Sequence, residues 1–103
     1  MAKVYLPDDI ENFIASLGDY QIDLFADLMV ISRVGPFDLD FCESHGSGIW
    51  AYRRQIGPSR YAYLLFAHFV DFDSYVVLHG FRGGPEGPTR SDLRFARRRS
   101  KAH

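Results

Sequence analysis

Residues 49–82 read IWAYRRQIGPSRYAYLLFAHFVDFDSYVVLHGFR, and this stretch decides the fold. Aromatic and β-branched residues fill three runs within it, separated by short breaks that contain Gly, Pro, Ser and Asp. Such breaks are typical of turns, and three strands joined by short turns predict an antiparallel meander. The predicted strands are Ile49–Ile56, Arg60–Phe69 and Ser74–Arg82.

Two helical patterns precede these strands. Asp8 or Asp9 is placed to cap the first helix, which ends at Gly18. Asp19 is placed to cap the second helix, which reaches about Val34. In both segments apolar residues recur at the spacing of one helical face. The predicted inner positions are Ile10, Phe13, Ile14 and Leu17 in the first helix, and Ile22, Phe25, Leu28 and Met29 in the second.

The remaining segments complete the order of elements. Lys3–Leu6 predicts a short strand, and residues 37–48 predict a loop because Asp, Ser and Gly dominate them. Thr89, with Asp92 three residues later, predicts the start of a final helix. The order β-α-α-β-β-β-α predicts one α+β domain over residues 1–103. Its antiparallel sheet should pack against the two N-terminal helices.

The charges are sorted along the chain. Residues 1–48 hold nine acids and two bases, whereas residues 49–103 hold ten bases and four acids. Guanidinium groups bind phosphate through paired hydrogen bonds, so the basic half suits a polyanion such as nucleic acid. The acidic half would be repelled by the same partner. The densest group of cations belongs to the final helix and comprises Arg90, Arg94, Arg97, Arg98, Arg99 and Lys101.

Several classes of protein are not expected from this sequence. Cys42 is the only cysteine, so an internal disulfide is excluded. The longest nearly apolar run, Tyr61–Phe69, is about half a membrane span, and the N-terminus lacks the apolar core of a signal peptide. We therefore expect a soluble cytoplasmic protein that uses no metal and no cofactor. The histidines that show no metal-ligand spacing with Cys42 are His45, His68 and His103.

Five landmarks occur in a characteristic order. They are Arg33–Pro36 (RVGP), Gly48–Arg53 (GIWAYR), Arg60–Tyr61, Val77–Phe81 (VLHGF) and Ala96–Arg99 (ARRR). The ordered set resembles the RelE superfamily of toxins from type II toxin–antitoxin systems, and within it the phage-derived HigB-like branch. The resemblance implies a RelE-like fold and a ribosome-dependent endoribonuclease that cuts messenger RNA without a metal and so inhibits translation and growth. It also implies a cognate protein antitoxin, of helix-turn-helix type, as the partner that silences the toxin.

The resemblance suggests roles for particular residues. Metal-free cleavage of RNA needs a proton-transfer group and cations that stabilise the charged phosphorane. His79 can titrate near neutral pH and is the candidate for proton transfer; Arg53 and Arg82 are the candidate catalytic cations. The candidates for binding RNA are Arg60, Arg94, Arg97, Arg98, Arg99 and Lys101.

Each of these roles has a structural alternative. In a regular strand His79 would share one side with Tyr75 and Val77, which favours a histidine of the core. Of Arg53 and Arg54, one can lie on the solvent face while the other pairs with an acid of the first two helices. The basic helix can also receive an acidic segment of an antitoxin.

The chain departs from the family pattern where cations are usual. The family usually has arginine directly after the tyrosine of the third strand, where this chain has Ala62 after Tyr61. After the His-Gly-Phe segment it usually has two lysines and a threonine, where this chain has Gly83, Gly84 and Pro85. These losses favour a second hypothesis, a binding module or phage-encoded inhibitor that captures a protein or RNA without cutting it. A toxin whose active site has been rebuilt from other residues is a third.

Overall fold

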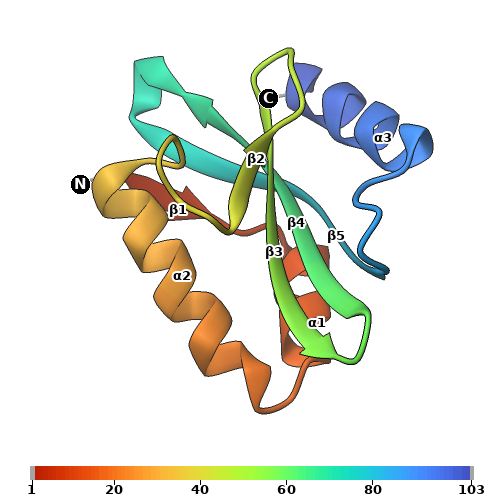
Figure 1. The fold of residues 1–103 in the computed structure, drawn as a ribbon. Coiled ribbons are helices and arrows are strands. Elements are labelled where there is room, and N and C mark those ends of the chain that lie inside the picture. Colours follow the sequence, from red (N-terminus) through yellow and green to blue (C-terminus); the bar gives the residue numbers. More distant parts are fainter. Residues whose placement is uncertain (1, 103) are drawn as a thin grey trace.

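The computed structural model describes residues 2–102, which form a five-stranded sheet and three α-helices (Figure 1). The class is α+β, as predicted. The chain also makes one short 3-10 turn, η1, between its two longest strands. The elements are β1 (Lys3–Tyr5), α1 (Asp8–Ala15), α2 (Tyr20–Val34), β2 (Cys42–Ser44), β3 (Ile49–Gly57), β4 (Arg60–Phe69), η1 (Val70–Phe72), β5 (Ser74–Gly83) and α3 (Arg90–Lys101).

The sheet has the spatial order β1-β5-β4-β3-β2. The strands β2 to β5 pair antiparallel with their neighbours, which confirms the predicted meander of three long strands. β1 pairs parallel with β5, so the sheet is mixed and not antiparallel throughout. The prediction of an unbroken loop over residues 37–48 is wrong at Cys42–Ser44, because these residues pair with Trp50–Tyr52 of β3 as an edge strand.

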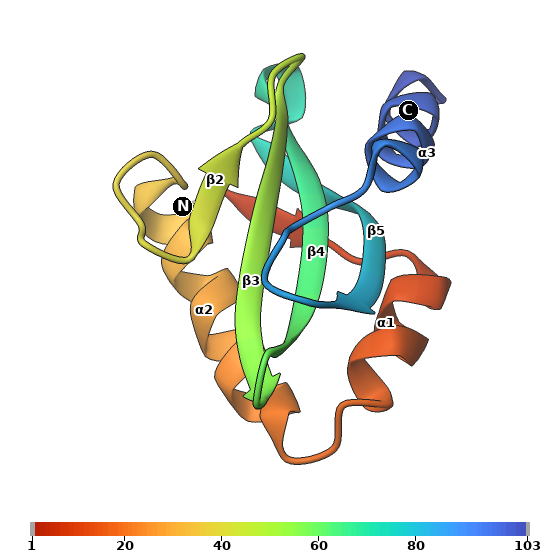
Figure 2. The same ribbon diagram turned by 45° about the vertical axis from the view of Figure 1, so that its right-hand side comes forward.

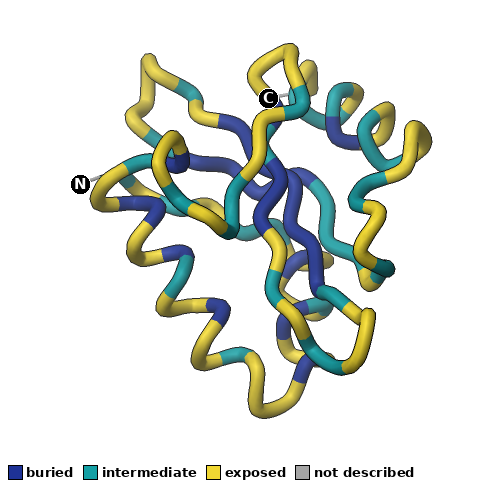
Figure 3. Tube along the Cα trace, in the orientation of Figure 1, coloured by how far each residue is buried: buried dark blue, intermediate teal, exposed yellow. Residues whose placement is uncertain are grey.

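The two faces of the sheet each carry a core. The helices α1 and α2 cover one face, and α3 covers part of the other (Figure 2). Buried residues therefore run along the middle of the sheet, while the outward turns of the helices are exposed (Figure 3). The first core includes Ile10, Ile14, Leu24, Leu28, Ile31, Tyr52, Leu64, Phe66 and Val77; the second includes Ile49, Ala51, Leu65, Ala67, Val76, Leu78 and Ala96.

The predicted inner face of α2 is confirmed at Leu28 and wrong at its other three positions. The helix buries Leu24, Leu28 and Ile31, whereas Ile22, Phe25 and Met29 are exposed. Both sides of this helix carry apolar residues at helical spacing, so the periodicity alone fits either orientation. In the observed orientation the buried residues of α2 face the sheet, and Asp23 and Asp27 lie beside Arg54 of β3.

The predicted N-cap of the first helix differs from the structure, whereas that of the second helix is confirmed in position. Pro7 occupies the N-cap position of α1, and Asp8 and Asp9 lie in its first turn, where their charges favour the helix dipole. Asp19 is at the N-cap position of α2, but its side chain makes no capping hydrogen bond.

A β-bulge in β5 decides which way His79 points. Leu65 of β4 is opposite His79, but the next residue, Phe66, is opposite Val77, so Leu78 is an additional residue in β5. Beyond such a bulge the alternation of side chains shifts by one residue. The expectation that His79 shares a side with Tyr75 and Val77 is therefore wrong: those two face α1 and α2, whereas His79 faces α3.

Within residues 2–102, no helix combines sufficient length with sufficient apolar character to cross a membrane.

Candidate nucleic-acid interface

The basic helix α3 is fixed in place at its first turn. Thr89 accepts a hydrogen bond from the backbone N–H of Asp92, and Asp92 accepts one from the backbone N–H of Thr89 at 2.9 Å. This reciprocal pair is the predicted capping box. Ala96 is fully buried against the second face of the sheet, and Leu93 is half-buried beside it. The cap and this narrow apolar contact together set which side of α3 faces solvent.

Five cations form a continuous stripe on the solvent side of α3, which we call the basic stripe. They line one shallow hollow of about 580 Å³. At 3.6 residues per turn their spacing keeps them within one side of the helix. The only acid of α3 is Asp92, which points to the sheet. The members of the basic stripe are Arg90, Arg94, Arg97, Arg98 and Lys101.

Arg97 lies at the inner border of the basic stripe. Its side chain is half-buried, and among the described residues no hydrogen-bond acceptor reaches its buried Nε. It also lines a second hollow of about 200 Å³, between the turn before β3 and the last turn of α3. Ser47, Ile49, Ser100 and Lys101 complete that hollow. The cationic surface thus continues from the helix toward the sheet.

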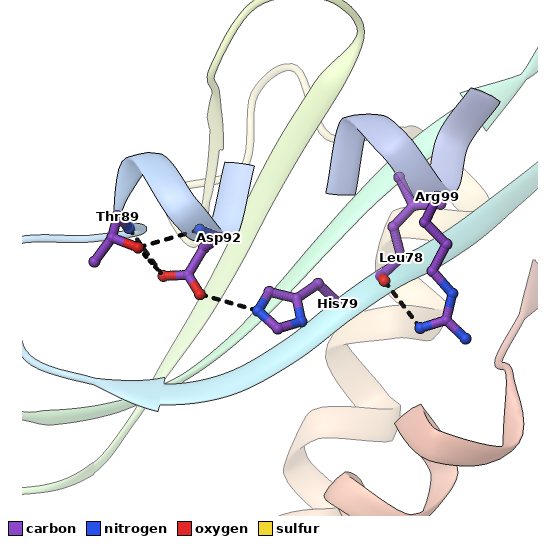
Figure 4. A network of polar contacts seen from close by, with 5 residues as sticks. All are labelled: Leu78, His79, Thr89, Asp92 and Arg99. Atoms are coloured by element: carbon purple, nitrogen blue, oxygen red, sulfur yellow. Dashed lines mark hydrogen bonds and ion pairs between the residues drawn. The ribbon is translucent and has the colours of Figure 1, made fainter. Parts of the chain in front are cut away.

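Arg99 does not belong to the basic stripe, although the sequence suggested it as an RNA contact. Its two terminal nitrogens each lie 2.7 Å from a carboxylate oxygen of Asp9 in α1. It also donates to the carbonyl oxygen of Leu78 at 3.3 Å (Figure 4). The hydrogen bonds from Arg99 lower the pKa of Asp9. Arg99 therefore ties α3 to α1, and its guanidinium is occupied within the fold.

His79 lies under the first half of α3. Its Nε2 is 2.9 Å from Oδ1 of Asp92 (Figure 4), and its ring lies between those of Phe81 and Phe95, with centroids at 5.0 and 4.7 Å. An ionised carboxylate only accepts hydrogen bonds, so Nε2 carries the proton. Among the described residues, none forms a hydrogen bond with Nδ1, and 22% of the side chain is exposed. In the neutral imidazole the lone pair is therefore on Nδ1.

Asp92 holds this histidine in one orientation. Burial of Asp92 opposes its ionisation, but hydrogen bonds from Thr89 and His79 outweigh that effect and hold its pKa below the ordinary value. The second carboxylate oxygen is used by the N–H and hydroxyl of Thr89. The histidine is therefore bonded to a carboxylate in the first turn of a helix.

Arg53 occupies a different environment. It is exposed on the α3 face of β3, where its guanidinium lies 4.9 Å from the ring centre of Tyr61 and donates to the carbonyl of Pro85 at 3.4 Å. It lines a cleft of about 420 Å³ between β2 and the loop before α3. His79 does not line this cleft. The cleft also contains the acids Asp40, Glu43 and Glu86, together with Cys42 and His45.

The mixed charge of this cleft makes it a poor phosphate site. Three carboxylates surround the one arginine, and they repel an anion that approaches it. Burial raises the pKa of the Cys42 thiol to about 12, so this thiol is not a nucleophile at neutral pH. A ligand that carries both a positive and a negative group suits this cleft better than a phosphate chain does.

Arg82 lies on the opposite face of the sheet from Arg53 and His79. It donates to the carbonyl and hydroxyl oxygens of Ser16 at 3.0 Å each, and its guanidinium packs over Phe13 of α1. Arg60 is exposed at the turn between β3 and β4. The structure therefore does not gather His79, Arg53 and Arg82 into one site.

Arg54 follows the structural alternative raised for it. Its guanidinium lies 2.8 Å from Asp27 and 3.3 Å from Asp23, both in α2. The acids of α2 thus neutralise a cation of the basic half, while the basic stripe has no such partner. The basic stripe and the acids of α2 therefore lie on opposite sides of the sheet, since α2 and α3 cover different faces.

The positions of the missing family cations are also informative. Ala62 is fully buried in the core under α1 and α2, so a side chain there points away from α3. Gly83 and Gly84 lie at the start of the loop that leads to α3, and Tyr63 donates a hydrogen bond to the carbonyl of Gly84. Only the loop positions are near enough to Arg53 to share a surface with it.

Metal ligands were also sought among the described residues. Within residues 2–102 no three His, Cys, Asp or Glu side chains are grouped so that they could hold an ion. His103, which the sequence analysis considered, lies outside the described residues.

Comparison with known proteins adds no family assignment. No protein-family model matches the chain, and comparison with curated proteins and with solved structures returns no significant match. The resemblance to RelE-like toxins therefore rests on the ordered landmarks of this sequence alone.

Sequence reasoning missed the partner of His79. Asp92 was identified only as a helix cap, and nothing in the local pattern around position 79 indicates a carboxylate 13 residues later. The capping box did contain a usable signal: Asp92 has two carboxylate oxygens, and the cap uses only one of them. The other oxygen can therefore bond a second group, which here is His79.

Proposed function

We propose that this chain is an RNA-binding toxin of the RelE type, which docks on ribosomal or messenger RNA through the basic stripe and inhibits translation. The observation that carries the proposal is the basic stripe itself, five cations on one side of α3 that face a common hollow. Four of them are exposed, and none forms an ion pair within residues 2–102. One or two cations in the last turn are enough to stabilise a helix through its dipole. The basic stripe covers three turns, so the helix dipole does not account for it.

The geometry of the basic stripe suits a phosphate backbone. Arginine donates two parallel hydrogen bonds to one phosphate, and four of the five residues are arginine. Such contacts position a nucleic acid without reading its sequence. An interface that neutralises five phosphates of a single strand should show a log–log salt slope of about −3.5. Arg99 adds no phosphate contact to this count, because it is engaged with Asp9.

The chemical step proposed for this toxin is cleavage of messenger RNA with His79 in proton transfer. Its support is the tautomer that Asp92 imposes, which leaves Nδ1 free to accept the proton of a 2′-hydroxyl. The basic stripe would position the RNA and not contact the scissile phosphate, because it lies on the solvent side of α3 whereas Asp92 and His79 lie on the sheet side. Arg82 cannot stabilise a phosphate at His79 either, because it lies across the sheet. The implied partner that silences the toxin, an antitoxin with acidic groups, would compete for the basic stripe.

The test begins with growth. Induced expression of the chain in bacteria should arrest growth, and primer extension should detect cuts of messages within the ribosomal A site. Arg94→Gln with Arg98→Gln should relieve the arrest and lower the affinity for single-stranded RNA, because it removes two phosphate contacts. Lys3→Gln is the control, since Lys3 is an exposed cation of the edge strand β1 and belongs neither to α3 nor to α2. Normal growth on induction of the folded wild-type chain would contradict the proposal.

A second function is favoured by one specific observation, the separation of Arg82 from Arg53 and His79. A protein that binds RNA or a protein partner without cutting needs the basic stripe but no assembled catalytic site. In this case His79→Ala should leave the biological effect of the chain intact while Arg94→Gln with Arg98→Gln removes it. If both changes remove growth arrest and A-site cuts together, the toxin reaction is supported instead.

A further inference from the structure

The outer face of α2 is apolar where a surface helix is normally polar. Ile22, Phe25 and Met29 expose 79%, 42% and 51% of their surface, and Val30 exposes 39%. Together with the exposed Ala26 they lie, by helical spacing, away from the buried Leu24 and Leu28. Figure 3 shows the outward turns of this helix as exposed. The core needs none of them, because Leu24, Leu28 and Ile31 fill the space between α2 and the sheet. A continuous apolar surface of this kind marks an interaction site more often than chance exposure does.

Two charges of opposite sign border this apolar face. Asp19 precedes its first residue, and Arg33 follows its last. Both side chains are exposed, and within residues 2–102 neither has an ion-pair or hydrogen-bond partner. The other acids of α2 behave differently, since Asp23 and Asp27 both pair with Arg54. The unpaired charges are therefore confined to the two ends of the apolar face.

The sequence of this face is complementary to itself when one copy is reversed. Asp19 and Arg33 are equally far from Ala26, and so are Ile22 and Val30. A two-fold axis through Ala26 consequently places Asp19 opposite the partner copy's residue 33, and Ile22 opposite the partner copy's residue 30. Asp19 and Arg33 lie about 21 Å apart along the helix at 1.5 Å per residue, so both ion pairs can form together. The smallest side chain of the face lies on the axis, where two helices approach most closely.

We propose that the outer face of α2 is a self-association surface, through which two copies of this chain pair with their α2 helices antiparallel about Ala26. The occupant is a second copy because the end charges match only in this reversed arrangement, and because a two-fold interface must be complementary to itself. The inference does not depend on the proposed toxin function. One helix per copy buries less surface than a standard interface, so the dissociation constant should be on the order of micromolar.

The dimer would have a defined consequence for the basic stripe. α2 and α3 cover opposite faces of the sheet and lie far apart in the views of both Figure 1 and Figure 2. A pair joined through α2 therefore carries its two basic stripes on its outer sides. Such a particle can hold two RNA segments at once and gains avidity for long RNA over short RNA.

The first test is the mass of the full chain in solution. Sedimentation equilibrium over a range of concentrations should show a monomer–dimer equilibrium, and Ile22→Glu should shift it to monomer by at least tenfold in the dissociation constant. Val70→Glu is the matched control, because Val70 is 76% exposed and belongs to η1. Circular dichroism should show both variants folded. A wild-type monomer at all concentrations, or a dimer that Ile22→Glu leaves unchanged, would overturn the proposal.

The second test reads the orientation of the pair. Asp19→Arg and Arg33→Asp should each weaken the dimer several-fold, and the double variant should restore it, because the charges exchange ends. A single Ala26→Cys in a Cys42→Ser background should form an intermolecular disulfide rapidly on oxidation, whereas Val70→Cys in the same background should not. Absence of charge rescue together with slow oxidation at position 26 would overturn the antiparallel arrangement. RNA affinity for a short strand should stay unchanged in all these variants, so failure here is distinct from failure of the toxin proposal.

Discussion

Asp92 joins the first turn of α3 to the bulged strand β5, with its Oδ1 2.9 Å from Nε2 of His79. Its other oxygen accepts from Thr89, so one carboxylate serves both the helix cap and the histidine. The pair links two segments that are separated by a loop of Gly and Pro. The orientation of His79 consequently depends on the docking of α3, and loss of the cap should disturb both.

Asp92 should make stability sensitive to acid. Its pKa is lowered in the folded state, since the hydrogen bonds from Thr89 and His79 outweigh the effect of burial. The ionised carboxylate therefore stabilises the fold fully above the ordinary pKa of 3.8, and this contribution is lost as the pH falls through the lowered value. Asp92→Asn should cost about 1 to 2 kcal/mol at pH 7 and flatten the acid decline. Urea unfolding at pH 7 and pH 3 measures both effects.

Asp73 provides the control for that experiment. Its carboxylate lies 3.3 Å from the exposed His68, and 69% of its side chain is exposed. Its φ of 44° is one that Asn tolerates well. Asp73→Asn should therefore change the free energy of unfolding little at either pH. An equal loss in both variants would mean that the contacts of Asp92 have no special weight.

Asp27 should be the most important acid of α2 for stability. One of its oxygens accepts from the hydroxyl of Tyr52 at 2.6 Å and from Arg54 at 2.8 Å. Tyr52 is fully buried, and burial together with the Asp27 charge raises the pKa of its hydroxyl. Asp27→Ala leaves that hydroxyl without its hydrogen-bond acceptor and should lower the free energy of unfolding by about 2 to 3 kcal/mol. Chemical denaturation measures this free energy.

Asp23 gives the comparison, because it contacts the same guanidinium at 3.3 Å from a half-exposed position. Asp23→Ala removes only a surface ion pair and should cost about 0.5 kcal/mol or less. Similar losses for both variants would show that Tyr52 gains nothing from its bond to Asp27.

Local pattern was sufficient to predict most elements of the fold. The three long strands have the bounds expected within one residue, because turn residues mark their ends. The start of α3 is also where the capping box predicted it. The pairing of Arg54 with an acid of α2 was one of the two alternatives considered, since alternation along β3 must send Arg53 and Arg54 to opposite faces.

The errors arose where distant parts of the chain decide the outcome. The bulge at Leu78 depends on how β5 registers with β4, and it reversed the side on which His79 lies. The inner face of α2 was misjudged because both of its sides are apolar. The candidate site failed in part for a similar reason: Arg82 follows the bulge, so its side chain reaches Ser16 of α1 and not the face of α3.

Gly80 should be intolerant of any side chain. A Cβ built there would lie 2.6 Å from Cδ2 of Phe13 and 3.2 Å from Cδ2 of Leu64, where β5 passes closest to α1. Gly80→Ala should therefore destabilise the fold by about 1 to 3 kcal/mol through overpacking. Phe13→Leu in the same chain should recover part of the loss by making room. Thermal unfolding of the single and double variants measures both changes.

The matched control for Gly80 is Gly57. A Cβ at Gly57 would have its nearest neighbour at 3.8 Å, an ordinary contact with Cβ of Arg60. Gly57→Ala should be within about 0.5 kcal/mol of the wild-type protein. A large loss at Gly57, or none at Gly80, would contradict the close approach of α1 to β5.

Arg98 and Arg99 are neighbours in sequence with opposite expected roles. Arg98 is exposed in the basic stripe, whereas Arg99 is bonded to both oxygens of Asp9. Arg98→Gln should lower RNA affinity and reduce the magnitude of the salt slope by about 0.7, because one phosphate contact is lost. Arg99→Gln should leave the salt slope unchanged. Titration of a single-stranded RNA at several salt concentrations measures the slope for each variant.

Stability should respond in the reverse order. Arg99→Gln frees α3 from α1 and leaves Asp9 without its partner, so the unfolding free energy should fall by up to about 1 kcal/mol, the range of a half-exposed pair. Arg98→Gln should not lower it, since removing one of several crowded cations relieves repulsion. If Arg99→Gln weakens RNA binding as much as Arg98→Gln while the protein stays folded, the division between a basic stripe that binds and an arginine that holds the helix is wrong.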